Sequence, residues 1–221
     1  MKNVFYLAIV LLGVLSSCTS KTEVASPNSN IKWSLNLDGK GAMTYQVTVN
    51  DRSFILPSAL GFEEKSGLNL KDGFQVVNTT FDTQDETWTQ PWGENKSIRN
   101  HYNEMAVNLQ NEAGVKLTVR VRVFDDGLGF RYEYDTPADS LLLMDEYTSF
   151  NIAEDGTSWS IPAEFNTYEL LYRTLPLSEM PDANTPMTFK TKSGVYASIH
   201  EAALTDFPEM CLKNVGGTSL K

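Results

Sequence analysis

Side chains that could do chemistry concentrate in one segment of the sequence, between Asp82 and Asn103. The segment holds two tryptophans, one of the chain's two histidines and several polar residues, without the alternation typical of a strand. We therefore predict a long ordered loop on a rigid sheet, the usual place for binding residues. The candidate substrate contacts in it are Arg99, Asn100 and His101.

The two tryptophans of this segment, Trp88 and Trp92, allow two interpretations. An indole face offers an apolar platform beside polar groups and suits a sugar ring. Packing into the domain's own core is the commoner role of tryptophan. The sequence leaves both interpretations open.

Motifs of self-contained catalytic sites are absent from the sequence. It has no cysteine pair at zinc spacing, no His-Glu-x-x-His, no phosphate-binding glycine loop and no Gly-x-Ser-x-Gly. With two histidines, the sequence argues against a catalytic triad and against a histidine-rich metal site. Carboxylates are numerous, but nothing local selects a pair for acid–base chemistry.

The strongest structural pattern is the stretch Leu117–Tyr134, which predicts the central hairpin of an antiparallel sheet. Val119, Val121 and Val123 alternate with arginines, and an aromatic series alternates in the same way after Asp125–Gly129. Burial of the apolar face favours a register with these pairs: Val123 opposite Phe130, Val121 opposite Tyr132, Val119 opposite Tyr134, and Gly129 opposite Phe124 across a four-residue loop.

The polar face of this hairpin would then place Arg122 opposite Arg131, which repel each other unless a carboxylate such as Glu133 lies between them. Solvated arginines on an ordinary sheet are one interpretation. A polar face that lines a ligand cleft is the other.

Short strands with turn signals about every ten residues extend this pattern and predict an antiparallel sandwich or barrel. The domain is expected to begin at Ile31. Three prolines within Leu175–Pro186 predict a surface excursion without regular structure. The last strand is expected at Gly194–His200, followed by a short helical stub at Glu201–Leu204.

The N-terminus predicts export and lipid attachment. Lys2 precedes an apolar run of 12 residues, Val4–Leu15, which is too short to span a bilayer and indicates a signal peptide over residues 1–17. Leu15–Cys18 resembles the lipobox of bacterial lipoproteins, which implies lipidation of Cys18. An ordinary signal peptide with an incidental cysteine is the alternative.

The polar residues that follow, 18–30, read as a lipid-anchored tether, so the expected location is the bacterial cell envelope, in the periplasm or on the outer membrane. Lipidation of Cys18 leaves Cys211 without a disulfide partner. The net charge of −10 argues against nucleic acid as a partner, because no basic stripe is present to neutralise phosphates.

Three stretches carry a resemblance to a known family: Glu86–Glu104, Phe124–Tyr132 and Ile199–Leu204. In this order and spacing they resemble the N-terminal domain of glycoside hydrolase family 97, bacterial alpha-glucosidases and alpha-galactosidases. The resemblance implies an all-β, antiparallel β-super-sandwich of the galactose-mutarotase-like kind over residues 31–221, truncated before a (β/α)8 catalytic barrel. It also implies that the full-length protein is an exo-acting alpha-glycosidase that hydrolyses oligosaccharides.

The same resemblance implies that the catalytic carboxylates lie in the barrel, so no catalytic residue is expected in this chain and the isolated chain should be inactive. It implies that Glu201 is a calcium ligand, since calcium accepts oxygens from separate segments. His200 would orient Glu201 or only cap the strand. Two other hypotheses remain: a non-catalytic carbohydrate-binding surface lipoprotein, and a structural domain at the membrane.

Overall fold

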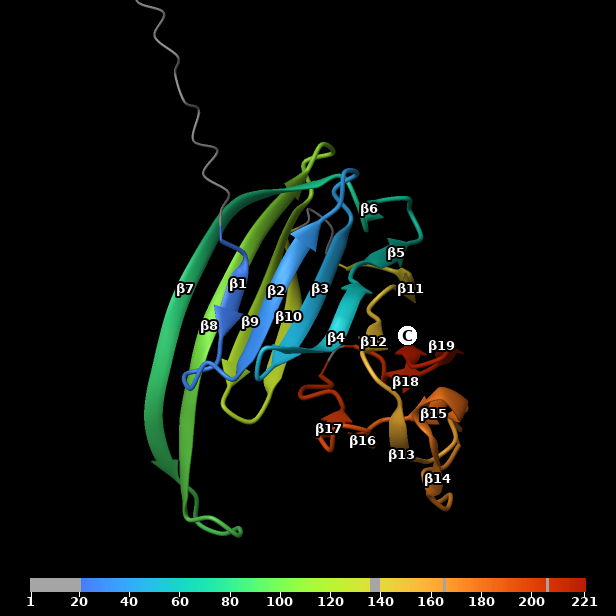
Figure 1. Cartoon of the computed structure of the whole chain (residues 1–221). Coiled ribbons are helices and arrows are strands. Elements are labelled where there is room, and N and C mark those ends of the chain that lie inside the picture. The colour runs from blue at the N-terminus through green and yellow to red at the C-terminus, as the bar shows by residue number, and fades with distance from the viewer. Residues whose placement is uncertain (1–20, 136–139, 165, 206) are drawn as a thin grey trace, which may run out of the picture.

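The computed structural model describes residues 21–135, 140–164, 166–205 and 207–221. The expected signal peptide and Cys18 lie outside these residues. Within them the fold is all-β, and the helical structure is a single 3-10 turn, η1, at Leu177–Glu179 (Figure 1). No helix in the described ranges is long and apolar enough to cross a membrane.

The larger of the two main sheets carries the N-terminal strands. Its order is β1 (Glu23–Ala25), β2 (Ile31–Leu37), β3 (Met43–Val49), β4 (Arg52–Ala59), β12 (Phe150–Ile152), β20 (Ser219–Leu220) and β19 (Asn214–Gly216). The expected start of the domain at Ile31 is therefore wrong. Residues Glu23–Ala25, assigned above to the tether, pair antiparallel with β2 and bury Val24 against the core.

The second main sheet packs against the first, with the core between them (Figure 1). Its order is β10 (Leu128–Asp135), β9 (Lys116–Phe124), β8 (Ser97–Asn111) and β7 (Phe74–Thr89). Val119, Val121 and Val123 point inward and are fully buried, while Trp33 and Tyr45 meet Phe130 across the core. The face of this sheet that points away from the core is called the outer face below.

Three smaller sheets complete the domain. Their strands are β11 (Leu143–Glu146), β5 (Phe62–Glu64) and β6 (Asn69–Leu70) in the first; β14 (Arg173–Pro176), β13 (Gly156–Ser160), β16 (Met187–Thr191) and β17 (Tyr196–Ile199) in the second; and β15 (Ala183–Asn184) and β18 (Cys211–Leu212) in the third. The second of these sheets joins the main core through the stacked rings of Phe54 and Phe189.

The proline-containing segment is not the expected surface excursion. Leu177, Met180 and Ala183 are buried, because these apolar side chains carry η1 and β15 into the core despite the prolines around them. The end of the chain also differs from expectation. β17 is followed by β18, β19 and β20, and Glu201–Leu204 forms no helix.

The central hairpin exists, but its register is shifted by two residues from the predicted one. The observed pairs are Phe130 with Val121, Arg131 with Arg120, Tyr132 with Val119 and Tyr134 with Leu117. The backbone N–H of Phe124 donates to the carbonyl of Gly127, so the turn is tighter than the four-residue loop expected. A two-residue shift keeps each side chain on its face, and the predicted apolar and polar faces are therefore both confirmed.

The segment Asp82–Asn103 is not a loop. It is the far end of β7 and β8, which pair residue by residue from Asn78 with Asn108 to Thr89 with Ser97. Tyr102 is the first residue of β8 that pairs with β9, so Asp85–His101 is a two-stranded extension, here called the arm. Trp88 and Trp92 are 49% and 84% exposed, and neither packs into the core.

Candidate functional site

Glu201 follows His200 after the end of β17, at the start of the segment that leads to β18. Its Oε2 accepts a hydrogen bond of 2.7 Å from the backbone N–H of Met210, which ties the two ends of this segment together. Among the described residues, Oε1 has no hydrogen-bond partner. Nδ1 of His200 lies 3.1 Å from the backbone oxygen of Glu201, so His200 contacts the backbone and not the carboxylate.

A second carboxylate, Glu146 at the end of β11, lies in the electrostatic range of Glu201. Burial raises the pKa of Glu146, and the negative charges of Glu201 and Asp145 add to the rise, while the hydrogen bond from Thr148 Oγ1 (2.6 Å) opposes it. The hydroxyl of Tyr132 lies 2.7 Å from that same Thr148 oxygen. Sequence reasoning missed Glu146, because its burial and its proximity to Glu201 arise only in the folded chain.

The candidate substrate contacts lie on the arm. Arg99 makes two hydrogen bonds of 2.8 Å to Asp85, which lower the pKa of that carboxyl, and Nδ2 of Asn100 donates to Glu86 (2.9 Å). Because side chains alternate along a strand, Arg99 and His101 share one face of the arm and Asn100 occupies the other. Arg99 and Asn100 therefore bind carboxylates of the neighbouring strand, and the three candidate side chains do not all share one face of the arm.

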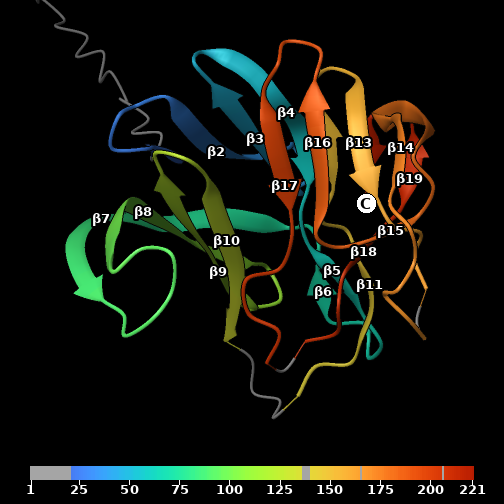
Figure 2. The ribbon, with the colours of Figure 1, turned by 90° about the horizontal axis from the view of Figure 1, so that it is seen from below.

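The arm and the Glu201 segment lie apart in the fold. Figure 2 places the arm on one side of β9 and β10 and the segment after β17 on the other side. Within this chain, the residues predicted for substrate and metal thus form two separate groups. Their roles in a longer protein stay predictions.

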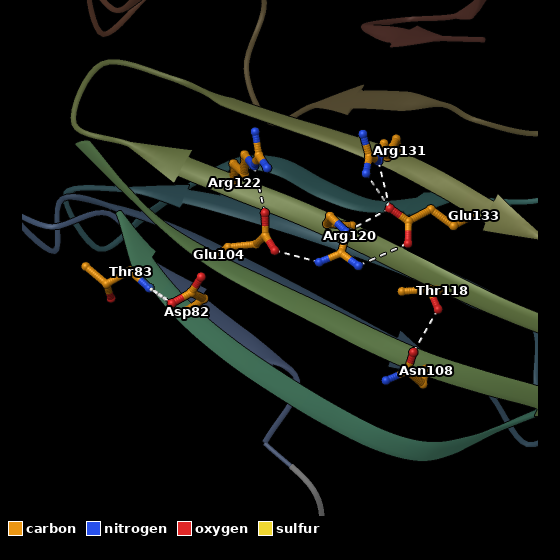
Figure 3. Close-up of polar contacts among 9 residues, drawn as sticks. All are labelled: Asp82, Thr83, Glu104, Asn108, Thr118, Arg120, Arg122, Arg131 and Glu133. Carbon is orange, nitrogen blue, oxygen red and sulfur yellow. Dashed lines mark hydrogen bonds and ion pairs between the residues drawn. The ribbon is translucent and has the colours of Figure 1, made fainter. Parts of the chain in front are cut away.

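An ion-pair network lies on the outer face of the second main sheet (Figure 3). Arg120 donates through Nε to Glu133 (2.7 Å) and through Nη1 to Glu104 (2.5 Å). Arg122 also donates to Glu104 (2.7 Å), and Arg131 donates to Glu133 (2.8 Å). Each carboxylate thus bridges two guanidinium groups, and its negative charge offsets the repulsion expected between facing arginines.

The network sets the protonation of its members. The hydrogen bond from Arg120, followed by that from Arg131, lowers the pKa of Glu133 to about 2. Burial works against ionisation of Glu104, yet the hydrogen bonds from Arg122 and Arg120 lower its pKa as well. Both carboxylates are therefore fixed as anions at neutral pH and are unsuited to proton transfer.

The described part of the chain holds no group of three or more His, Cys, Asp or Glu side chains able to bind a metal ion. Calcium takes six to eight oxygen ligands. Glu201 therefore fits calcium only as one ligand among others supplied from elsewhere.

A family model described as glycosyl-hydrolase 97 N-terminal matches residues 24–220. The chain belongs to this family. The match confirms the resemblance drawn from the three sequence motifs. It also agrees with the observed start of the fold at β1, which precedes Ile31.

Two relatives of this glycosyl-hydrolase 97 N-terminal domain are galactosidases. A retaining alpha-galactosidase from Bacteroides thetaiotaomicron is 23% identical over 235 residues, covering 99% of this chain and 34% of that protein. A probable retaining alpha-galactosidase from Streptomyces bingchenggensis is 28% identical over 174 residues, covering 77% of this chain and 27% of that protein. The chain thus spans about a third of the length of these relatives or less.

Solved structures agree on the fold. Glycoside hydrolase family 97 enzymes from Pseudoalteromonas sp. strain K8, in complex with panose and with acarbose, superpose with a TM-score of 0.84 at 34% identity. Each match covers 90% of this chain and 31% of the enzyme. A beta-arabinopyranosidase with a TM-score of 0.80 is 20% identical and shares the fold alone.

Proposed function

We propose that this domain is the N-terminal part of an exo-acting alpha-glycosidase, an alpha-glucosidase or alpha-galactosidase, that hydrolyses oligosaccharides. The observation that carries the proposal is the match of nearly the whole chain to glycosidases about three times as long. The names of two relatives indicate alpha-galactosides, and the sugars panose and acarbose in related structures indicate alpha-glucosides. The resemblance implies that the catalytic carboxylates lie in the barrel, so we expect the isolated chain to be inactive.

Within that enzyme, we propose that Glu201 is a calcium ligand shared with a (β/α)8 barrel and borders the substrate pocket. The support is chemical. The Met210 N–H holds Oε2 and so limits the directions in which the carboxylate can point, and among the described residues Oε1 has no hydrogen-bond partner. A bound calcium ion would polarise the glycosidic region and stabilise neighbouring carboxylates in the ionised form.

Two neighbours of Glu201 bear on this role. Glu146 is a nearby carboxyl with a raised pKa, and a cation bound at Glu201 would offset the negative charge that contributes to that rise. Nδ1 of His200 contacts the backbone oxygen of Glu201, so His200 would position the segment and not the metal. On this proposal, Arg99, Asn100 and His101 contact substrate only if the barrel brings substrate to the arm.

The test uses the enzyme encoded by the complete reading frame. We expect Glu201→Gln to lower both bound calcium, measured by atomic emission, and kcat/KM on chromogenic alpha-glucosides and alpha-galactosides. The matched control is Glu209→Gln, an exposed carboxylate in the same segment, which should change neither. Unchanged calcium content in Glu201→Gln would remove Glu201 from the metal site, and a reading frame without a barrel would remove the enzyme proposal.

A carbohydrate-binding surface lipoprotein is the second candidate, favoured by the exposed rings of Trp88 and Trp92 on the arm. It requires that residues 21–221 alone bind oligosaccharide, which calorimetry with maltotriose or melibiose measures. Both candidates include lipidation at Cys18. Incorporation of labelled fatty acid into the wild-type protein, and its loss in Cys18→Ser, tests that attachment.

A further inference from the structure

The first strand of the domain shortens the expected lipid tether. The sequence predicts a tether over residues 18–30, yet β1 lies within it and pairs with β2. The pairing begins before β1 itself. The carbonyl of Thr22 accepts a hydrogen bond from the N–H of Leu35 (2.9 Å), and its hydroxyl donates to the carbonyl of the same residue (2.8 Å). Only residues 19–21 then separate Cys18 from the folded domain.

Contacts with both main sheets hold β1 in place. Val24 is buried in the core between the sheets. The carbonyl of Ala25 accepts a hydrogen bond from Nδ2 of Asn103 on β8 (2.9 Å), and the N–H of Asn28 donates to Asp125 in the turn after β9 (2.8 Å). A longer tether would require β1 to leave the sheet, which would expose Val24 and break these bonds, so the link stays short.

The length of this link limits how far the domain can lie from a lipid on Cys18. From Cys18 to Thr22 a fully extended chain spans at most about 14 Å. Because β1 is antiparallel to β2, its start points to the end of the sandwich that carries the β2–β3 turn (Figure 1). This end consists of that turn, residues 38–42, and the β8–β9 turn, residues 112–115, and it is called the near end below.

The near end and the tip of the arm lie at opposite ends of β7. The N–H of Gly73, the residue before β7, donates to the carbonyl of Lys40 in the near end (2.8 Å). At the other end of β7, the N–H of Gln90 donates to the carbonyl of Lys96 in the arm (3.0 Å). Between these two contacts the 16 residues of β7 extend over roughly 50 Å. Figure 1 shows the start of β1 and the tip of the arm pointing in opposite directions.

The surface of the near end is polar. Lys40 is exposed, and Asp38 accepts hydrogen bonds from the N–H groups of Lys40 and Ala42 (2.8 Å each). A hollow lined by Lys40 and Glu112 joins the two turns. Among the described residues of these turns, no large apolar side chain is exposed. The near end therefore suits contact with lipid headgroups without insertion, and its mixed charges give it little attraction of its own for a bilayer.

We propose that lipidation at Cys18 seats the near end on the membrane and directs the arm away from it. This inference rests on the lipidation included in the proposed function. A link much shorter than β7 prevents the domain from turning over, so the tip of the arm lies roughly 50 Å from the bilayer. The exposed rings of Trp88 and Trp92 then face the solvent from which a soluble oligosaccharide arrives.

Energy transfer to labelled vesicles tests this orientation. The full-length lipoprotein is reconstituted in phosphatidylcholine vesicles that carry an acceptor dye on the headgroup of a minor lipid. A donor dye is attached to propargyl-lysine that replaces either Lys40 or Lys96, both of which are exposed. Transfer from position 40 should be at least about twofold that from position 96, since roughly 50 Å separates them. Equal transfer, or stronger transfer from position 96, overturns the proposal.

Two variants show whether the link sets the orientation. Insertion of about 20 Gly and Ser residues between Ser20 and Lys21 adds a flexible coil of roughly 25 Å. Transfer from position 40 should then fall toward that from position 96. Cys18→Ser should abolish transfer from both positions. A difference that survives the insertion, or transfer that survives Cys18→Ser, would mean that the surface binds lipid by itself, which overturns the proposal.

The outcomes separate this inference from the proposed function. If the wild-type protein incorporates no labelled fatty acid, the lipidation and the orientation both fail, while the glycosidase proposal keeps its own test at Glu201. If fatty acid is incorporated and the two positions transfer equally, the lipidation stands and the orientation fails.

Discussion

Glu201 and Met210 are joined by a hydrogen bond of 2.7 Å that closes the segment between β17 and β18. The backbone N–H of Met210 is the donor, so the contact depends on the oxygen of Glu201 and not on the identity of the residue at position 210. The bond gives Glu201 a structural role that is separable from any role in metal binding.

This separation leads to a stability prediction for residues 21–221. Glu201→Ala should lower the free energy of unfolding by about 1–2 kcal/mol, because the partly buried N–H of Met210 loses its acceptor. Glu201→Gln keeps an acceptor oxygen and should unfold close to wild type. Urea denaturation followed by tryptophan fluorescence measures both. A Glu201→Ala variant as stable as wild type would show that the bond does not hold the segment.

The network on the outer face predicts a pH dependence of stability. The pKa of Glu133 is about 2 in the folded protein, below its ordinary value of 4.5, so its ionised form stabilises the fold. This contribution is complete above the unfolded pKa, near pH 4.5, and is lost as pH falls through the folded pKa of about 2.

Glu133→Gln should therefore be less stable than wild type at pH 6, by about 1 kcal/mol after allowance for solvent screening of a partly exposed group. The difference should shrink below pH 4.5 and disappear near pH 2. Thermal unfolding of both proteins across this range measures it. A constant difference at every pH would indicate lost packing and not lost charge.

Alternation along the strands of the central hairpin predicted which face is buried but not which residues pair. Both the predicted register and the observed one place Val121 and Phe130 on the inner face, because they differ by two residues. Burial therefore cannot distinguish them, and the choice depends on the turn. Glu133 was predicted to bridge Arg122 and Arg131. In the structure it bridges Arg120 and Arg131 instead.

The arm was missed for a physical reason. Strands are recognised by alternation only where one face is buried, and neither face of Asp85–His101 is buried in this chain. The Glu201 motif was found through its resemblance to a family, since its local sequence has no distinctive pattern. Its neighbour Glu146 had no such signal, because its raised pKa comes mainly from burial, which its local sequence does not reveal.

Glu146 predicts a pH dependence of the opposite sign. Its raised pKa means that the ionised form is disfavoured in the folded state, mainly by burial. Below the unfolded pKa both states are protonated and there is no penalty. The penalty grows as pH rises from the unfolded pKa and is complete above the folded pKa.

Glu146→Gln should consequently raise the melting temperature of residues 21–221 at pH 7 and leave it nearly unchanged at pH 4. The glutamine retains an oxygen that can accept the hydrogen bond from Thr148. Calorimetric scans at the two pH values measure the effect, and Glu112→Gln, an exposed carboxylate, is the control. Lower stability of Glu146→Gln at pH 7 would mean that the carboxylate has a favourable partner at that pH.

The close pairing of β13 with β16 leaves no room for a side chain at Gly156. A Cβ built there lies 1.9 Å from the backbone oxygen of Lys190, and backbone cannot move aside as a flexible side chain does. We expect Gly156→Ala to destabilise residues 21–221 by more than about 3 kcal/mol, in the range of severe core substitutions. The matched control is Gly127→Ala in the turn after β9, where a Cβ meets nothing within 4 Å. Chemical denaturation should show the control within about 0.5 kcal/mol of wild type, and equal stability of the two variants would mean that β13 and β16 are not paired at Gly156.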